Sequence, residues 1–300
     1  MAGSPSVSAF DAPDFDERVS ARRRKGLVFA TMLFIATVFG LVVLVVLLVD
    51  VVLKGMTYLD ADFLTSYPSR FTERAGIKSA LVGSLWMMGL TALFAVPIGV
   101  ASAVYLEEYA SRGWFFRLIQ VNIANLAGVP SVLYGILGLA LFVRYFALGR
   151  SLLAGSFTMA LLILPVIIIA TQEALRAVPQ GLRESAYGVG ATRWQVVWSH
   201  LLPVAAPGIL TGVILSLSRA IGETAPLIMI GALSFVAFLP ESVMDSFTVL
   251  PIQIFNWTAR PQAEFRELAA AGIIVLMVLL FALNLSAILL RNHFEKRRAG

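Results

Sequence analysis

Cysteine is absent from the 300-residue chain. This absence excludes a disulfide framework, a thiolate metal site and a cysteine nucleophile. Charged residues are also scarce, at 14% of the sequence, whereas 59% is hydrophobic and the mean hydropathy is +0.85. A chain with so few polar side chains cannot cover a soluble body with them. We therefore expect it to lie in a lipid bilayer.

Several kinds of functional motif are missing as well. No Gly-Lys dipeptide occurs, so the chain has no Walker A loop and any ATP must be bound by another chain. His200 and His293 have no partner at metal-ligand spacing, and no nucleophile motif has a matched base. The net charge of +5 comes from basic residues scattered between apolar runs, which argues against nucleic acid. We expect a protein that is not an enzyme and binds no metal and no cofactor.

Six apolar runs are long enough to cross a bilayer as helices, which takes about 20 residues. They are residues 27–53, 79–104, 118–143, 155–172, 205–235 and 267–290. The first follows four basic residues but exceeds the roughly 7 to 15 apolar residues of a signal peptide, so we expect an uncleaved helix. The predicted fold is an all-α membrane protein with a six-helix domain over residues 27–290.

The distribution of Lys and Arg predicts the orientation. Basic residues are more frequent before the first run, near Gly113, in residues 173–203 and after the last run than in the other connections. The positive-inside rule then places both termini in the cytoplasm. Residues 1–26, rich in small residues, Pro and Asp, are predicted to be a mobile tail, and residues 291–300 a basic tail at the lipid headgroups.

The longest of the cytoplasmic connections, residues 173–203, is predicted to form two short helices at an angle. Gly190 suits the left-handed position after the first helix, and Thr192 with Gln195 predicts a capping box that starts the second. Pro203 is expected to end it. Trp194, Val197, Trp198 and Leu201 share one face of the second helix. That face fits a docking surface, or equally a helix that lies on membrane lipid.

A pair of charges, Arg219 and Glu223, interrupts the apolar run of residues 205–235. An arginine in hydrocarbon costs about 2.5 to 3.5 kcal/mol and therefore normally faces a protein interior or water. A helix places Arg219 about 18 Å from Pro207, near the middle of the bilayer core. Its planar fork of donors suits the oxygens of an anion. The pair predicts an anion pathway, with a purely structural ion pair between helices as the alternative.

Prolines predict breaks near these charges. Pro226 removes the helical partner of the Gly222 carbonyl, and Pro130 does the same to Leu126. The hydroxyls of Thr224 and Ser131 are expected to satisfy the freed backbone groups, with Asn122 and Asn125 as further polar wall. Pro97 and Pro165 are expected to be ordinary kinks.

Other charged residues are predicted to be less informative. Glu173 and Arg176 are spaced to bond to each other, to a neighbouring subunit or to water at a helix end. Glu107 and Glu108 follow the second apolar run and are expected to lie in water.

The 173–203 segment resembles the EAA motif of ABC importer permeases. The matching residues, at the full spacing of that motif, are Glu184, Ser185, Ala186, Gly190, Leu202 and Pro203. Ser185 replaces the usual alanine and His200 the usual isoleucine, and neither changes the length. The resemblance implies the fold of a type I importer permease, in which this loop docks into a groove of an ATPase subunit.

A second set of residues resembles the phosphate-specific permeases of that family. These residues are 219–226 (RAIGETAP), 128–135 (GVPSVLYG) and 250–257 (LPIQIFNW). Their order, over about residues 25–295, resembles the PstA type more than the PstC type. The resemblance implies a permease subunit of a phosphate importer in the bacterial inner membrane. Its implied partners are a second permease (PstC-like), an ATPase dimer (PstB-like) that holds ATP and Mg²⁺, and a periplasmic phosphate-binding protein (PstS-like).

Two alternatives to a phosphate permease stay open on the sequence. The first is a permease for another oxyanion, sulfate or molybdate, because an arginine does not by itself distinguish them. The second is a secondary transporter or channel that works alone. That class needs no cytoplasmic docking loop and often shows an internal repeat, which residues 27–143 and 155–290 do not show clearly.

Overall fold

The structure, a computed structural model, describes residues 13–232 and 235–299, and these residues form helices and connecting turns without a strand. Contacts divide the chain into two units, one ending at Leu53 and one beginning at Lys54. Each is described by itself. Within the described residues, five helices are long and apolar enough to cross a membrane, and a bent pair of helices makes a sixth candidate span.

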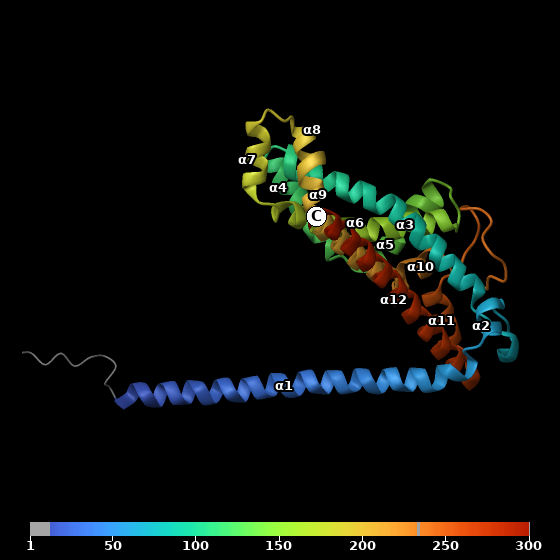
Figure 1. Cartoon of the computed structure of the whole chain (residues 1–300). Helices are drawn as coiled ribbons and strands as arrows, with labels where there is room; N and C mark the ends of the chain where they lie inside the picture. Colours follow the sequence, from blue (N-terminus) through green and yellow to red (C-terminus); the bar gives the residue numbers. More distant parts are fainter. Residues whose placement is uncertain (1–12, 233–234, 300) are drawn as a thin grey trace, which may run out of the picture. The chain divides into compact units, whose positions relative to one another are not determined.

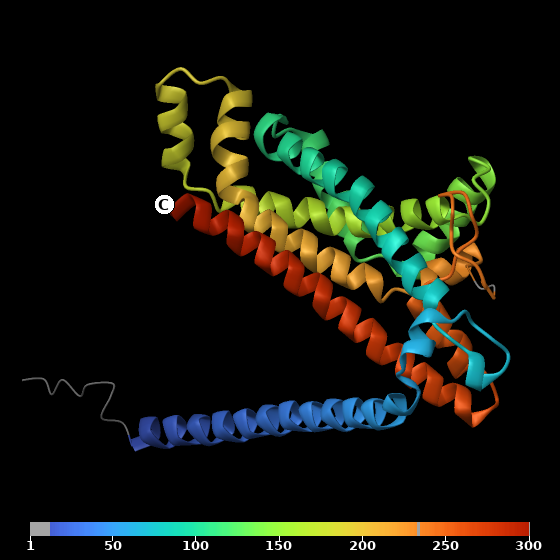
Figure 2. The ribbon, with the colours of Figure 1, turned by 45° about the vertical axis from the view of Figure 1, so that its right-hand side comes forward.

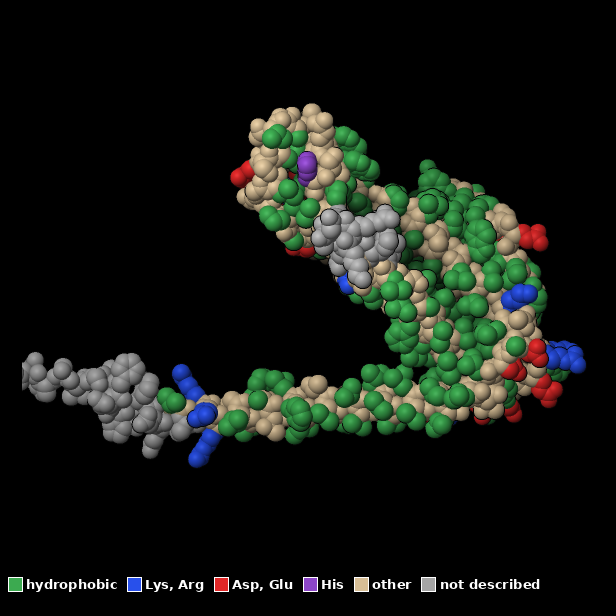
Figure 3. Space-filling model, in the orientation of Figure 1, with side chains coloured by type: hydrophobic (Ala, Val, Ile, Leu, Met, Phe, Trp, Pro, Cys, Tyr) green, Lys and Arg blue, Asp and Glu red, His purple; other side chains and the backbone are tan. Residues whose placement is uncertain are grey.

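In the first unit the described residues all belong to the helix α1 (Pro13–Gly55), whose last two residues fall in the second unit. Its side chains from Arg22 to Leu53 are exposed almost throughout, and hydrophobic side chains follow its length, with Lys and Arg at its beginning (Figure 3). The helix begins well before residue 27, where the sequence predicted its start. The rest of the predicted tail, residues 1–12, lies outside the described residues.

The second unit contains eleven further α-helices within the described residues. They are α2 (Ala61–Thr65), α3 (Lys78–Val104), α4 (Trp114–Ala127), α5 (Ser131–Gly138), α6 (Leu152–Arg176), α7 (Gln180–Gly188), α8 (Arg193–Gln195), α9 (Leu202–Ile221), α10 (Ala225–Ile230), α11 (Leu250–Thr258) and α12 (Ala263–Ala299). Short π-helical turns extend α3 (Tyr105–Tyr109) and α5 (Leu139–Tyr145) and join α8 to α9 (Val196–Leu201). Helices α7 and α8 lie at one end of this unit, and α2 and α11 at the other (Figure 1 and Figure 2).

The core of the second unit is built around α6, which packs against α3 on one side and α9 on another. Small residues permit the close contacts. A Cβ on Gly99 of α3 would lie 2.6 Å from the side chain of Ile167, and one on Gly212 of α9 would lie 2.4 Å from Ala170. In a membrane, where water does not drive helices together, such small residues let backbones approach and gain dispersion contacts.

Two predicted spans differ from the structure. The span predicted at residues 118–143 is broken into α4 and α5, which are bent by 103° at Gly128–Pro130. The span predicted at residues 205–235 ends at Ile221 and resumes as the short α10. Pro130 and Pro226 both lie at these breaks, because a proline leaves a helix without one amide donor. Pro97 and Pro165 instead lie inside continuous helices, as predicted for kinks.

The expected stop at Pro203 is wrong. The helix runs without interruption from Arg193 to Ile221. Proline clashes with the carbonyl four residues before it, and the π-helical turn Val196–Leu201 widens the helix at that position. The second short helix of the predicted loop is therefore the first part of a long one.

The connection between α10 and α11 is fastened to the bundle. The Ser79 hydroxyl donates to the Val236 carbonyl at 2.7 Å, and the amide of Leu250 donates to the Ser84 hydroxyl at 2.9 Å. The carbonyls of Val243 and Asp245 accept from the first amides of α6, which otherwise lack partners. These bonds attach residues 236–250 to α3 and α6.

Candidate substrate pathway and coupling loop

The two helix breaks lie on neighbouring helices. A Cβ added to Gly135 of α5 would lie 2.7 Å from the Pro226 Cα and 2.8 Å from the Met229 Cβ, both in α10. Only glycine permits this approach, because Cβ contacts that short do not occur in proteins. The segments that follow Pro130 and Pro226 therefore pack together although they are far apart in sequence.

The carbonyl that Pro130 frees is satisfied by a residue that sequence reasoning missed. The Tyr134 hydroxyl donates to the Leu126 carbonyl at 2.8 Å, and the Val129 amide donates to the same oxygen at 3.1 Å. The predicted role of the Ser131 hydroxyl at this carbonyl is therefore wrong. Tyr134 lies one turn into α5, so its hydroxyl reaches back across the bend. A tyrosine one turn after a helix-breaking proline is the sequence signal for such a bond.

Replacing Tyr134 with Phe is expected to lower the free energy of unfolding by about 1 kcal/mol, the usual net worth of one hydrogen bond. The phenyl ring keeps its buried packing, so only the bond to Leu126 is lost. Thermal unfolding of the detergent-solubilised protein measures the change. The exposed Tyr145, replaced by Phe in the same way, is the control and should leave the unfolding temperature unchanged. Equal effects of the two changes would contradict this role of Tyr134.

Arg219 and Glu223 form an ion pair with each other across the end of α9. The Arg219 Nε donates to Glu223 Oε1 at 3.3 Å, where α9 ends beside the break. The Arg219 side chain is 52% exposed in the isolated chain and that of Glu223 is 18% exposed. Arg219 shares its open face of α9 with Val204, Gly208 and Leu215. A charge exposed at this depth is stable where water or another protein chain covers it, since hydrocarbon opposes it.

The other predicted pathway residues are not gathered around Arg219 by hydrogen bonds. Ser131 and Thr224 are partly buried at the starts of α5 and α10, and Asn125 is exposed in the last turn of α4. In the part of the chain that the structure describes, none of their side chains bonds to Arg219 or Glu223. The Asn122 amide donates to the Leu118 carbonyl of its own helix at 2.8 Å.

A polar contact beside Arg219 was not predicted. The Ser218 hydroxyl hydrogen-bonds the Asn284 side chain of α12 and also donates to the Ile214 carbonyl at 2.7 Å. This contact lies on the wall of a mostly apolar groove of about 390 Å³ between α3, α9 and α12. It ties α9 to α12 one residue before the arginine.

The predicted turn between α7 and α8 is confirmed in detail. Gly190 has a φ of +81°, the left-handed value that favours glycine. The Thr192 hydroxyl accepts from the Gln195 amide at 3.4 Å, and the Gln195 side chain accepts from the Thr192 amide at 2.8 Å. These two bonds form the capping box that starts α8. Glu184 and Ser185 are exposed on α7, whereas Ala186 is buried.

The predicted aromatic and aliphatic stripe is divided. Trp194 and Trp198 are exposed and stack on each other, with ring centroids 5.6 Å apart. Val197 and Leu201 are instead buried in the core. The spacing of four is kept within each pair, whereas Trp194 and Val197, three apart where the π-helical turn begins, are exposed and buried respectively. The exposed part of the predicted stripe is thus a pair of tryptophans.

The sequence predicted that Glu107 and Glu108 lie in water, and this prediction is wrong. Their side chains are 5% and 8% exposed, and arginines of α6 and α7 pair with them. Arg176 of α6 donates from Nε to both Glu107 carboxylate oxygens at 3.1 Å. It also contacts Glu173 at 3.1 Å, the pair that the sequence allowed.

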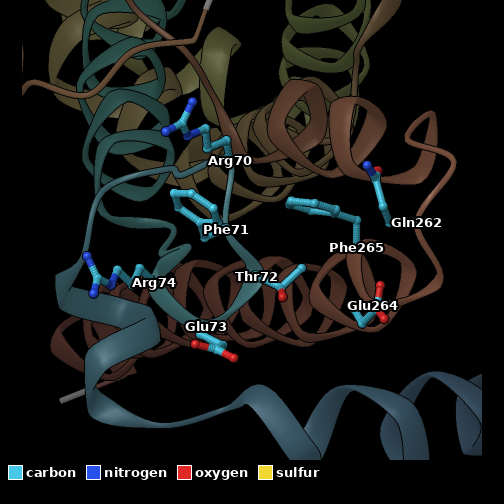
Figure 4. A pocket seen from close by; sticks show the side chains of 8 residues that line it. All are labelled: Arg70, Phe71, Thr72, Glu73, Arg74, Gln262, Glu264 and Phe265. Atoms are coloured by element: carbon cyan, nitrogen blue, oxygen red, sulfur yellow. The ribbon is translucent and has the colours of Figure 1, made fainter.

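A separate hollow of about 530 Å³ lies at the opposite end of the second unit, between residues 70–74 and the start of α12. Phe71 and Phe265 point into it from opposite walls, whereas Arg70 and Arg74 point away from its centre (Figure 4). The Arg70 guanidinium lies over the Phe71 ring at 4.7 Å. Because the cations do not converge, this hollow is not arranged to hold an anion.

Comparison with known proteins identifies relatives of the whole chain. Residues 95–300 match the family model of the binding-protein-dependent transport system inner membrane component. The chain is 32% identical over 309 residues to the phosphate transport system permease protein PstA 1 of Mycobacterium tuberculosis, covering 99% of this chain and 100% of that protein. It is 33% identical over 260 residues to the phosphate transport system permease protein PstA of Haemophilus influenzae, covering 87% and 91%.

Solved structures show the same fold. A subunit of a bacterial ABC transporter involved in the import of the acidic polysaccharide alginate aligns with a TM-score of 0.65 at 16% identity, covering 92% of this chain and 99% of that one. A second structure of an alginate ABC transporter, in complex with its periplasmic protein, aligns with a TM-score of 0.64 at 19% identity, covering 93% and 96%. The all-α fold is that of an ABC type I importer permease.

Proposed function

The chain belongs to the binding-protein-dependent transport system inner membrane components, and we propose from this premise that it is the permease subunit of an ATP-driven importer of inorganic phosphate. It forms half of the translocation pathway in the inner membrane. The observation that carries the choice of cargo is the 32% identity, over nearly the whole chain, with a protein named as a phosphate permease.

The physical basis of anion transfer is the exposed guanidinium of Arg219. Five donors in a planar fork bind phosphate oxygens well. Glu223, at 3.3 Å, holds this guanidinium between passages and competes with the anion for it. Such competition favours a pathway that passes phosphate on over one that binds it tightly. Thr224, Ser131 and Asn125 supply polar wall near the helix breaks.

Energy comes to this chain through the segment that carries the EAA motif. Glu184, Ser185 and Gly190 are exposed on α7 and its turn, next to the exposed pair Trp194 and Trp198. Ala186 packs inward, and Leu202 and Pro203 continue into α9. This arrangement supports docking of α7 and α8 to a separate ATPase, on which ATP and Mg²⁺ are bound and hydrolysed.

The proposed assembly contains four kinds of subunit. The partners are a PstC-like permease, a dimer of PstB-like ATPases and a periplasmic PstS-like phosphate-binding protein. The PstC-like permease covers the open face of α9, since Arg219 is half exposed in this chain alone. The end with α7 faces the cytoplasm, as do both termini.

Reconstitution of the four proteins in liposomes tests this function. We expect ATP-dependent uptake of radiolabelled phosphate that requires the binding protein. Excess sulfate or molybdate should leave the uptake unchanged. Uptake that either anion abolishes, or uptake without the ATPase, would contradict the proposed cargo or the proposed class of transporter.

A further inference from the structure

Four charged residues join the end of α3 to the ends of α6 and α7. Glu107 and Glu108 are adjacent in the π-helical turn that ends α3, a rare geometry that is frequent at functional sites. Both carboxylates are buried. Taking two neighbouring carboxylates out of water is costly unless cations are held beside them. We call Glu107, Glu108, Arg176 and Arg183 the charge clasp.

The α6 half of the clasp is a forked contact. Arg176 stands at the last position of α6, and its Nε and terminal nitrogen reach both oxygens of Glu107 at 3.0 to 3.1 Å. Its other terminal nitrogen contacts Glu173, which is 65% exposed. Forked contacts of this kind fix orientation as well as distance. The end of α6 is thus held at a set angle to the end of α3.

The α7 half of the clasp depends on a single nitrogen. Arg183 Nη2 lies 3.0 Å from Glu108 Oε1 and donates to the Leu175 carbonyl of α6 at 2.7 Å. Glu108 Oε1 is buried and accepts no hydrogen bond from the described residues. Its compensation is therefore electrostatic and comes from Arg183. Arg183 directly precedes Glu184, the first residue of the EAA motif.

Apart from the clasp, α7 packs against the π-helical turn Val196–Leu201. Ala186 is buried and Leu182 is partly buried, whereas Tyr187 and Val189 are exposed. A buried ion pair seldom adds net stability compared with apolar residues of similar volume. What it adds is a defined geometry, and this one lies between the docking helix and two membrane helices.

We propose that Glu108 and Arg183, supported by Glu107 and Arg176, are positioning residues that make α7 move together with the ends of α3 and α6. The inference rests on the proposed function, because it concerns how work done on α7 reaches the pathway. Helix α6 packs against α9, so a displacement of α6 reaches the helix that carries Arg219.

The test is the number of phosphate ions imported per ATP hydrolysed by the reconstituted four-protein complex. Glu108→Gln keeps the shape and removes the charge, and we expect this ratio to fall at least about fivefold while ATP hydrolysis persists. Glu173→Gln is the matched control, because the Glu173 side chain also contacts Arg176 but is exposed to solvent. The ratio of this variant should equal the wild-type value. An unchanged ratio in Glu108→Gln overturns the proposal. If Glu108→Gln loses phosphate uptake and ATP hydrolysis to the same extent, the proposal is also overturned, because such a loss indicates only misfolding.

A covalent cross-link between positions 108 and 183 distinguishes a positioning role of these residues from a general contribution to stability. The chain has no cysteine, so the double variant Glu108→Cys with Arg183→Cys introduces the chain's first thiols. With accessible cysteines removed from the partners, we expect the unlinked variant to have a low ratio and a short bifunctional thiol reagent to restore it. Reductive cleavage of the link should lower the ratio again. A link that leaves the ratio low, or that stops transport, overturns the proposal.

A measurement without phosphate distinguishes failure of the clasp from failure of the proposed cargo. A spin label at Gly181→Cys, where a side chain meets no neighbouring atom, reports the mobility of α7 in the assembled complex. Glu108→Gln should raise this mobility and Glu173→Gln should not. Equal mobility in all three proteins contradicts the clasp whatever the complex transports. A wild-type complex that imports no phosphate, with the mobility difference present, contradicts only the cargo.

Discussion

Replacing Arg219 with Ala is expected to lower phosphate uptake by the reconstituted importer about 10- to 100-fold, the equivalent of the about 1.5 to 3 kcal/mol of a hydrogen bond to a charged group. The side chain supplies the charge on the open face of α9, next to the break at Gly222. Without it, phosphate must enter an apolar stretch with no cation to replace its hydration. Initial rates of radiolabelled uptake measure the effect, and ATP hydrolysis should continue.

Companion variants separate charge from geometry. Arg219→Lys keeps the charge but not the planar fork, so its uptake should lie between those of wild type and Arg219→Ala. Glu223→Gln removes the competitor of the anion and should slow its release. Arg117→Ala, at an exposed arginine of α4 away from both breaks, is the control and should transport normally. Wild-type uptake by both Arg219→Ala and Glu223→Gln would falsify the role given to this pair.

The second large effect is expected at Gly135. A Cβ there would meet the Pro226 Cα at 2.7 Å, the Pro226 carbonyl oxygen at 2.8 Å and the Met229 Cβ at 2.8 Å. None of these atoms is the flexible end of a side chain, so Gly135→Ala must push α5 away from α10. Overpacking of this kind costs about 1 to 3 kcal/mol. We expect a lower unfolding temperature and a severe loss of uptake, because both helix breaks shift.

Gly89 provides the matched control for this prediction. It also lies inside a helix, α3, but a Cβ there would meet no atom within 4 Å. Gly89→Ala should therefore be neutral, or slightly stabilising through the higher helix propensity of alanine. Unfolding temperatures of the two variants in the same detergent, together with their uptake rates, check the difference. If Gly135→Ala unfolds at the wild-type temperature and transports normally, the close packing of α5 on α10 is not needed.

Local chemistry made part of this structure predictable. The apolar runs predicted the membrane helices, Gly190 and the Thr192 capping box predicted the turn after α7, and Pro130 and Pro226 predicted the helix breaks. Each of these signals acts within a few residues of its own position. Hydropathy did not reveal the 103° bend, because the residues on both sides of Pro130 are equally apolar.

Several errors concern partners that are distant in the sequence. Glu107 and Glu108 follow an apolar run, as solvated helix ends do, and Arg176, which buries Glu107, lies 69 positions further on. The contact between Gly135 and Pro226 joins helices whose proximity no spacing shows. The position of Tyr134 was readable, but its bond depends on the angle of the bend.

The uninterrupted helix from Arg193 to Ile221 joins the exposed tryptophans to Arg219 in one lever arm. Its exposed Trp194 and its Arg219 lie roughly 38 Å apart along one axis, at 1.5 Å of rise per residue. If the helix pivots at its Arg219 end, a tilt of about 10° displaces Trp194 by roughly 7 Å. If it pivots near its middle, the two ends move in opposite directions. A single rotation of this helix then moves the Arg219 guanidinium while its bond to Glu223 is kept.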